Sequence, residues 1–175
     1  MLSLIWSQSS ILQSNGQWHA ATYRGITIGK SRRADMLRVF GQPKWSRAQR
    51  EETEEDSQPE VWNSYERIGE FPGRTTVVVD KRSGTIVRID FYPDKLTKQQ
   101  AIEHFGPDYI ITKYDFEPCS DDEESEPIYE SPTGPLVSLE YRARGIAIAI
   151  GHQDLVTKIS YVSGAIGAPK SRCQQ

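Results

Sequence analysis

Residues 96–107 have the sequence LTKQQAIEHFGP, and residues 31–43 have the related sequence SRRADMLRVFGQP. Each stretch begins near a hydroxyl residue, Ser31 or Thr97, whose side chain is suited to cap the first turn of a helix. Apolar residues then recur at helical spacing, and Gly followed closely by Pro ends each stretch. The pattern predicts two short helices with similar start and stop signals.

Extended segments follow each predicted helix in the same order. Alternating or continuous apolar runs predict strands at residues 61–65, 75–80 and 85–92, and again at 137–141, 146–150 and 155–162. The turn at residues 81–84 contains Gly84, which tolerates the positive φ that a tight hairpin requires. The recurrence of helix, stop, hairpin and final strand predicts an internal repeat.

The repeat predicts an α+β fold of two tandem units. Each unit would be a short helical segment plus an antiparallel β-meander, with the helices packed on one face of a sheet that is continuous or saddle-shaped across both units. The predicted boundaries are an N-terminal extension at 1–20, repeat unit 1 at 21–95, repeat unit 2 at 96–163 and a C-terminal tail at 164–175. The first 20 residues carry no pattern that decides between an extra strand and disorder.

The final strands of the two units align residue by residue, and period-2 alternation assigns their faces. The face toward the helices is predicted to carry Val87, Ile89, Phe91, Thr157, Ile159 and Tyr161. Interfaces concentrate their binding energy in Trp, Tyr and Arg. We therefore expect a protein-binding site on the opposite face, at Trp62, Arg88, Asp90, Tyr92, Lys158 and Ser160. For Trp62, packing in the core is the open alternative.

The composition is that of an ordinary globular protein with no marked charge preference. The chain has 175 residues and a formal net charge of -3, which favours neither nucleic acid nor anionic lipid as a partner. The length fits one compact domain or two small ones. No stretch approaches the ~20 apolar residues that span a bilayer, so no membrane span is expected.

The compartment stays open on sequence grounds. Residues 1–6, MLSLIW, are apolar but lack the basic region of an intact signal peptide. The protein would be periplasmic or secreted if a leader was removed, and cytoplasmic otherwise. Cys119 and Cys173 lie far apart in polar sequence, so they either pair in an oxidising compartment or remain thiols.

Acidic residues cluster in two places, at 51–56 and 121–126. Charges this dense repel one another and bury nothing, so both segments are predicted to be mobile loops. Neither has the spacing of a calcium-binding loop. The loops would steer a basic partner toward the sheet.

No constellation of residues predicts catalysis. Residues 25–31, GITIGKS, have three residues between the glycines where a phosphate-binding loop needs four. His19, His104 and His152 lack a nearby nucleophile or metal-ligand signature. We expect no catalytic, cofactor-binding or metal site, no cofactor and no enzymatic activity.

The glycine-flanked segment 25–31, the helices ending in Gly and Pro, and the hairpins resemble the SmpA/OmlA-like and beta-lactamase-inhibitor-protein-like tandem repeat fold, over residues 21–163. The tandem copies are more similar to the inhibitor than to the single-unit outer-membrane lipoproteins. The inhibitor's disulfides within each repeat have no counterpart in Cys119 and Cys173, and the start lacks a lipid-bearing cysteine. The resemblance implies a bacterial protein that presents a sheet surface to a protein partner without a cofactor.

The function that follows is a non-catalytic protein-binding module, inhibitor-like or scaffold-like, which presents a sheet face to a macromolecular partner of unknown identity. One alternative is an envelope-assembly or periplasmic structural component, which predicts a leader and lipobox upstream. Another is a cytosolic immunity-type protein, which predicts a native start at Met1. An enzyme would require a deep pocket with converging polar side chains.

Overall fold

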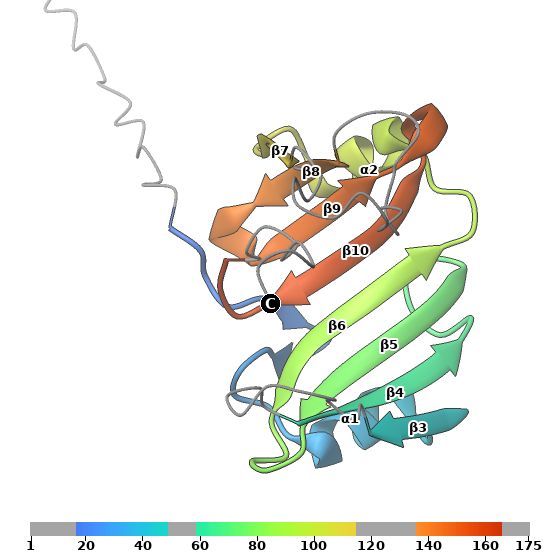
Figure 1. The fold of residues 1–175 in the computed structure, drawn as a ribbon, viewed down its shortest axis with the longest axis vertical. Helices are drawn as coiled ribbons and strands as arrows, with labels where there is room; N and C mark the ends of the chain where they lie inside the picture. The colour runs from blue at the N-terminus through green and yellow to red at the C-terminus, as the bar shows by residue number, and fades with distance from the viewer. Residues whose placement is uncertain (1–16, 49–58, 115–135, 166–175) are drawn as a thin grey trace, which may run out of the picture.

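A computed structural model describes residues 17–48, 59–114 and 136–165 (Figure 1). Its main feature is an eight-stranded antiparallel sheet with the strand order β3-β4-β5-β6-β10-β9-β8-β7. The strands are β3 (Trp45–Ala48), β4 (Glu60–Glu66), β5 (Gly73–Asp80), β6 (Ile86–Pro93), β7 (Ile110–Tyr114), β8 (Leu136–Tyr141), β9 (Ile146–Ile150) and β10 (Val156–Val162).

The remaining elements are short and lie mostly on one side of this sheet. They are a two-stranded sheet of β1 (Thr22–Tyr23) and β2 (Ile26–Thr27), the helices α1 (Arg33–Phe40) and α2 (Lys98–Phe105), and the 3-10 turns η1 (Arg142–Arg144) and η2 (His152–Asp154). Figure 1 looks onto the opposite side, which we call the outer face, and both helices and the small sheet lie behind it. We call the side that they cover the inner face.

The prediction of two tandem helix-plus-meander units is wrong. β6 and β10 lie side by side in the middle of the sheet, with Ile89 opposite Tyr161 and Phe91 opposite Ile159. The hydrogen bonds between β6 and β10 join β3–β6 and β7–β10 into one sheet of eight strands, and one contiguous core underlies it. The final strands of the two predicted units pair with each other, which satisfies backbone groups that would otherwise form two exposed edges. With two helices of only eight residues each, the sheet dominates the fold.

The core occupies the inner face. α1 contributes Met36 and Phe40, and α2 contributes Ala101 and Phe105. These side chains pack on inner-face strand residues, among them Ile89, Phe91, Ile159 and Tyr161, whose inward direction is confirmed. Burial of this apolar surface is the main stabilising contribution to a fold with such short helices.

Two β-bulges overturn the inward assignment of Val87 and Thr157. The register shifts between Val78 and Val79 in one strand pair and between Val156 and Lys158 in another. A bulge inserts one residue and so reverses the alternation beyond it. Ile86 and Val156 therefore fill the inward positions and are buried, whereas Val87 is half-buried and Thr157 is exposed.

Only one of the two predicted caps is confirmed. The Thr97 hydroxyl accepts a hydrogen bond of 3.2 Å from a backbone N–H in the first turn of α2. Ser31, however, does not cap α1, since its hydroxyl accepts from the Thr27 N–H at 3.0 Å. The N-cap is Arg32, whose backbone N–H donates to the Asp35 carboxylate at 3.0 Å.

The segment before α1, for which no strand was predicted, forms the β1–β2 hairpin and enters the core. Ala21, Tyr23, Ile26 and Ile28 are all buried there. The Ala21 N–H donates to the carbonyl oxygen of Val162 on β10, and the Gly29 N–H donates to that of Ile86 on β6, both at 2.8 Å. The hairpin thus ties together the two strands that meet at the centre of the sheet.

Several predicted features lie outside the described residues: both acidic loops, 51–56 and 121–126, both cysteines, Cys119 and Cys173, and most of the N-terminal extension. Within the described ranges, neither eight-residue helix has the length or the apolar run that spanning a bilayer requires.

Replacing Gly145 with Ala tests how tightly the N-terminal segment is seated. Gly145 has a φ of 64°, and an added Cβ would collide with the His19 carbonyl oxygen and the Ala21 nitrogen. Gly84 is a matched control, because its φ is 70° but nothing lies within 4 Å of its Cβ position. In denaturant titrations we expect Gly84→Ala to lower the free energy of unfolding by about 1 kcal/mol, which is the conformational cost alone. Gly145→Ala should lower it by at least about 3 kcal/mol, and equal effects would contradict this packing.

Candidate functional site

The predicted site residues lie on the outer face of the sheet. Cross-strand pairing aligns Trp62 with Val78 and Val78 with Arg88, and it places Asp90 opposite Ser160. Alternation along β6 and β10 brings Tyr92 and Lys158 to the same face. None of the six predicted residues (Trp62, Arg88, Asp90, Tyr92, Lys158, Ser160) belongs to the core under the helices.

Asp90 is the most buried charged group of this face. Its side chain is 1% exposed, and its two carboxylate oxygens accept hydrogen bonds from different strands. The Arg88 Nε–H donates to one oxygen at 2.8 Å, and the Ser160 hydroxyl donates to the other at 2.7 Å. A buried carboxylate is tolerated only when it is paired and hydrogen-bonded in this way. Asp90 and Ser160 are therefore too buried to contact a partner, and they position Arg88.

Arg88 is the charged group that this arrangement presents. Burial by itself would lower the pKa of its guanidinium, but the charge of Asp90 and its hydrogen bond raise the pKa overall. The guanidinium lies over the Trp62 ring, 5.7 Å from the ring centre. This contact bridges β4 and β6 and covers Val78 on β5, the strand between them. The Trp62 ring is fixed in turn by a hydrogen bond of 3.0 Å from its Nε1–H to the Glu60 carboxylate. Trp62 is half-buried rather than part of the core.

A second arginine–aromatic contact involves Tyr92, four residues beyond Arg88 on β6. Arg74 is directly opposite Tyr92 in the β5–β6 pair, and its guanidinium lies 4.3 Å from the centre of the tyrosine ring. Burial raises the pKa of the Tyr92 phenol above its usual value, and the nearby Asp90 charge adds to this effect, so the hydroxyl stays neutral at physiological pH.

Sequence reasoning missed Arg74, although a signal for it was present. The turn at 81–84 fixes the pairing of the flanking strands, so Tyr92 requires a partner on β5. It also missed Trp45 on edge strand β3, which is 43% exposed and lies opposite Ser64. β3 escaped the prediction because all four of its residues are exposed, so it lacks the apolar alternation of a half-buried strand.

A hollow of about 390 Å³ brings three of the predicted residues together. Arg88, Lys158 and Ser160 line it, along with Glu60 and the chain that follows β10. Trp62 and Tyr92 lie outside its lining. The hollow therefore adds Lys158 to the cationic surface next to Arg88, while the two aromatic side chains form separate points of contact.

The other candidate chemistries are not assembled. His104 lies beside Glu70 with its Nε2 3.5 Å from the carboxylate, His19 uses its backbone N–H to bind the Arg142 carbonyl, and His152 lies in η2. No group of three or more His, Cys, Asp or Glu side chains within the described ranges could hold a metal ion. Residues 25–31 run through the end of the β1–β2 hairpin and a turn, a path unlike a phosphate-binding loop.

Comparisons with known proteins add little. No protein-family model matches the sequence, and no curated protein matches it significantly. Among solved structures, the crystal structure of a DUF4309 family protein (YjgB) from Bacillus subtilis subsp. subtilis str. 168 is similar, with a TM-score of 0.44 and 14% sequence identity. The alignment covers 80% of this chain and 83% of that chain. A likeness at this level supports no conclusion about the fold or function of this chain. The SmpA/OmlA-like and beta-lactamase-inhibitor-protein-like resemblance stays a prediction.

The Asp90→Ala variant tests whether this carboxylate holds the centre of the sheet. The substitution leaves a buried Ser160 hydroxyl without its acceptor and Arg88 without its counter-ion. We expect the free energy of unfolding to fall by about 2 kcal/mol or more. This loss is smaller than that for breaking a fully buried ion pair, because the Arg88 side chain is 30% exposed.

Glu66→Ala is the control for this variant, since its ion pair with Lys44 is exposed on both sides and should contribute nothing measurable. Denaturant titration of both variants gives the comparison. An Asp90→Ala variant as stable as Glu66→Ala would show that the carboxylate is dispensable.

Proposed function

We propose that this chain is a non-catalytic protein-binding module that holds a protein partner against the outer face of its sheet, in an inhibitor-like or scaffold-like role. The observation that carries the proposal is the pair of arginine–aromatic contacts on that face, Arg88 with Trp62 and Arg74 with Tyr92. Arginine, tryptophan and tyrosine are the side chains that most often dominate binding energy at protein interfaces.

Preorganisation supports this use of the face. Arg88 is held by Asp90, and Trp62 is held by its hydrogen bond to Glu60. Both stand on strands in the interior of the sheet, where paired neighbours on each side restrict backbone movement. A side chain that is already ordered loses less conformational entropy when a partner binds, so more of its contact energy appears as affinity.

The outer face carries charges of both signs. Arg47, Arg74, Arg88 and Lys158 are its cationic groups, with Arg88 paired to Asp90, whereas Glu60 lies near Arg88 and Glu66 lies opposite Arg74. The face therefore suits a partner surface with a polar rim of mixed charge around an apolar centre, which would pack on Trp45 and Trp62. The two acidic loops, which were expected to steer a basic partner, lie outside the described residues and do not enter this argument.

The experiment uses the full chain, immobilised, to capture proteins from an extract of the source organism, followed by affinity measurement with the purified partner. Trp62→Ala and Arg74→Ala should each weaken binding by about 30-fold, as expected for truncated anchor residues. The matched control is Arg38→Ala, because Arg38 is an exposed arginine on α1, away from the outer face.

The dependence on the outer face decides the outcome. Capture that is lost in Trp62→Ala and Arg74→Ala but kept in Arg38→Ala supports the proposal, provided that all three variants unfold at the wild-type denaturant midpoint. Equal binding by all variants would show that the partner uses another surface.

A further inference from the structure

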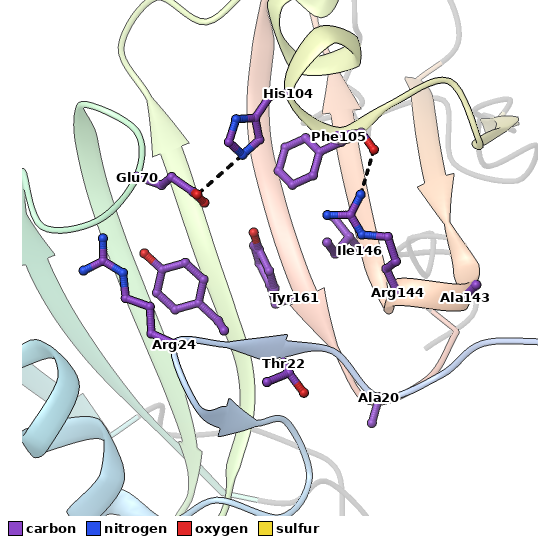
Figure 2. Close-up of a pocket in the computed structure, with 11 residues that line it drawn as sticks. Ala20, Thr22, Arg24, Glu70, His104, Phe105, Ala143, Arg144, Ile146 and Tyr161 are labelled. Carbon is purple, nitrogen blue, oxygen red and sulfur yellow. Dashed lines mark hydrogen bonds and ion pairs between the residues drawn. The ribbon is translucent and has the colours of Figure 1, made fainter.

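The inner side of the sheet is not completely filled. A cavity of about 480 Å³ lies where the β1–β2 hairpin, the β4–β5 connection, the end of α2 and η1 meet. Figure 2 shows side chains from all four segments converging on it, among them Arg24, Glu70, His104 and Arg144. Its volume is in the range of sites for small ligands, and the outer-face proposal makes no use of it.

The charges around this cavity are not balanced. Glu70 and His104 form a pair across its rim at 3.5 Å. The two arginines have no carboxylate partner among the described residues: Arg24 contacts only the Tyr23 ring, at 5.5 Å, and the Arg144 Nη1–H donates to the Phe105 carbonyl oxygen at 2.7 Å. Two guanidinium groups without counter-ions beside one cavity attract an anion.

Arg144 is also held in a fixed orientation. Its guanidinium lies 5.3 Å from the Phe105 ring centre and 5.7 Å from that of Tyr141. The hydrogen bond to the Phe105 carbonyl uses one of its five N–H groups, which leaves others available to an acceptor. Figure 2 shows Arg24 and Arg144 on opposite sides of Tyr161, whose hydroxyl points toward the side of the cavity where Glu70 and His104 lie.

A second, independent observation comes from the floor of the cavity. Tyr23 is 5% exposed, and its hydroxyl is a buried polar atom with no hydrogen-bond partner among the described residues. The Glu70 backbone lies near enough to influence this phenol, but it makes no hydrogen bond of ordinary geometry with the hydroxyl. Buried hydroxyl groups are nearly always satisfied, so this one lacks an acceptor of the kind that a ligand would supply.

The protonation state of both tyrosines suits this role. Burial raises the pKa of the Tyr23 phenol above its usual value and does the same for Tyr161, where the charge of Glu70 adds to the effect. Both hydroxyls therefore remain protonated at physiological pH. They can donate hydrogen bonds to an oxyanion, and their rings form apolar walls together with Phe105 and Ile146.

The backbone conformation of Arg24 also supports a binding role for the cavity. Arg24 and Gly25 form the tight turn between β1 and β2, and both have positive φ, 47° and 82°. Asn, Asp or Gly normally occupies the first of these positions, because at positive φ a Cβ atom crowds the backbone carbonyl, which Gly avoids and Asn or Asp offsets by local hydrogen bonds. An arginine at this position places a guanidinium at the cavity at a conformational cost, which is a pattern associated with binding sites.

We propose that this cavity binds a small organic anion that is attracted by Arg24 and Arg144 and whose carboxylate or phosphate oxygens accept hydrogen bonds from the hydroxyls of Tyr23 and Tyr161. The carbon skeleton lies against the aromatic walls. The site is independent of the outer face and its partner, so either proposal can fail without the other.

The test titrates the full chain with inorganic phosphate and, separately, with benzoate, at constant chloride concentration, and follows backbone amide chemical shifts. We expect saturable shifts confined to the hairpin turn, the end of α2 and η1. Arg24→Asn should weaken binding at least about tenfold, since it removes a charged hydrogen-bond donor. Asparagine is chosen because it is favoured at positive φ in this type of turn. Arg38→Ala, which removes an exposed arginine of α1 that does not line the cavity, should leave the affinity unchanged.

Tyr23→Phe separates a binding role from a structural one. Removing an unsatisfied buried hydroxyl should leave the melting temperature unchanged or raise it, yet anion binding should weaken. Binding of phosphate alone assigns the site to phosphate-bearing ligands, and binding of benzoate alone assigns it to carboxylates. Saturable binding of neither probe, or equal weakening by Arg24→Asn and Arg38→Ala, would overturn the proposal.

Discussion

The rest of the structure depends on one constraint, the satisfaction of a buried carboxylate where β6 and β10 meet. Asp90 accepts hydrogen bonds from Arg88 on its own strand and from Ser160 on the neighbouring strand. Because an unsatisfied buried charge is very costly, this pair of bonds favours one register of the two strands over all others. A slip of one residue would turn every side chain of β10 to the wrong face. The N-terminal hairpin binds backbone groups of the same two strands, which reinforces the junction from the inner side.

The junction gives the protein two surfaces of different character. Ser160 and Tyr161 are consecutive in β10, so one lies on the outer face beneath Arg88 and the other lies in the cavity on the inner side. The outer face carries the arginine–aromatic contacts of the proposed protein-binding surface, and the inner side carries the polar side chains of the proposed anion site. Both proposed sites therefore depend on the same pair of strands.

Local patterns in the sequence predicted the elements but not their assembly. The cap at Thr97, the turn at Gly84 and the alternation in β6 and β10 depend on neighbouring residues, so the sequence alone was sufficient. The pairing of β6 with β10 joins segments about 70 residues apart, and no local signal encodes it. The bulges reversed the alternation of inward and outward side chains at their positions. The short edge strand β7 lacked a clear pattern of apolar residues. The cavity was beyond prediction because Arg24, Glu70 and Arg144 come from three separate segments.

Native-state amide hydrogen exchange tests the central claim, that the junction makes the eight strands one cooperative unit. Val77 on β5 and Ile148 on β9 are fully buried and lie on opposite sides of the β6–β10 pair. If the sheet opens only as a whole, both amides exchange with the same free energy, equal to that of global unfolding, and respond equally to denaturant. If β3–β6 and β7–β10 exchange with different free energies, each with its own denaturant dependence, the strands form two separable units and the account is wrong.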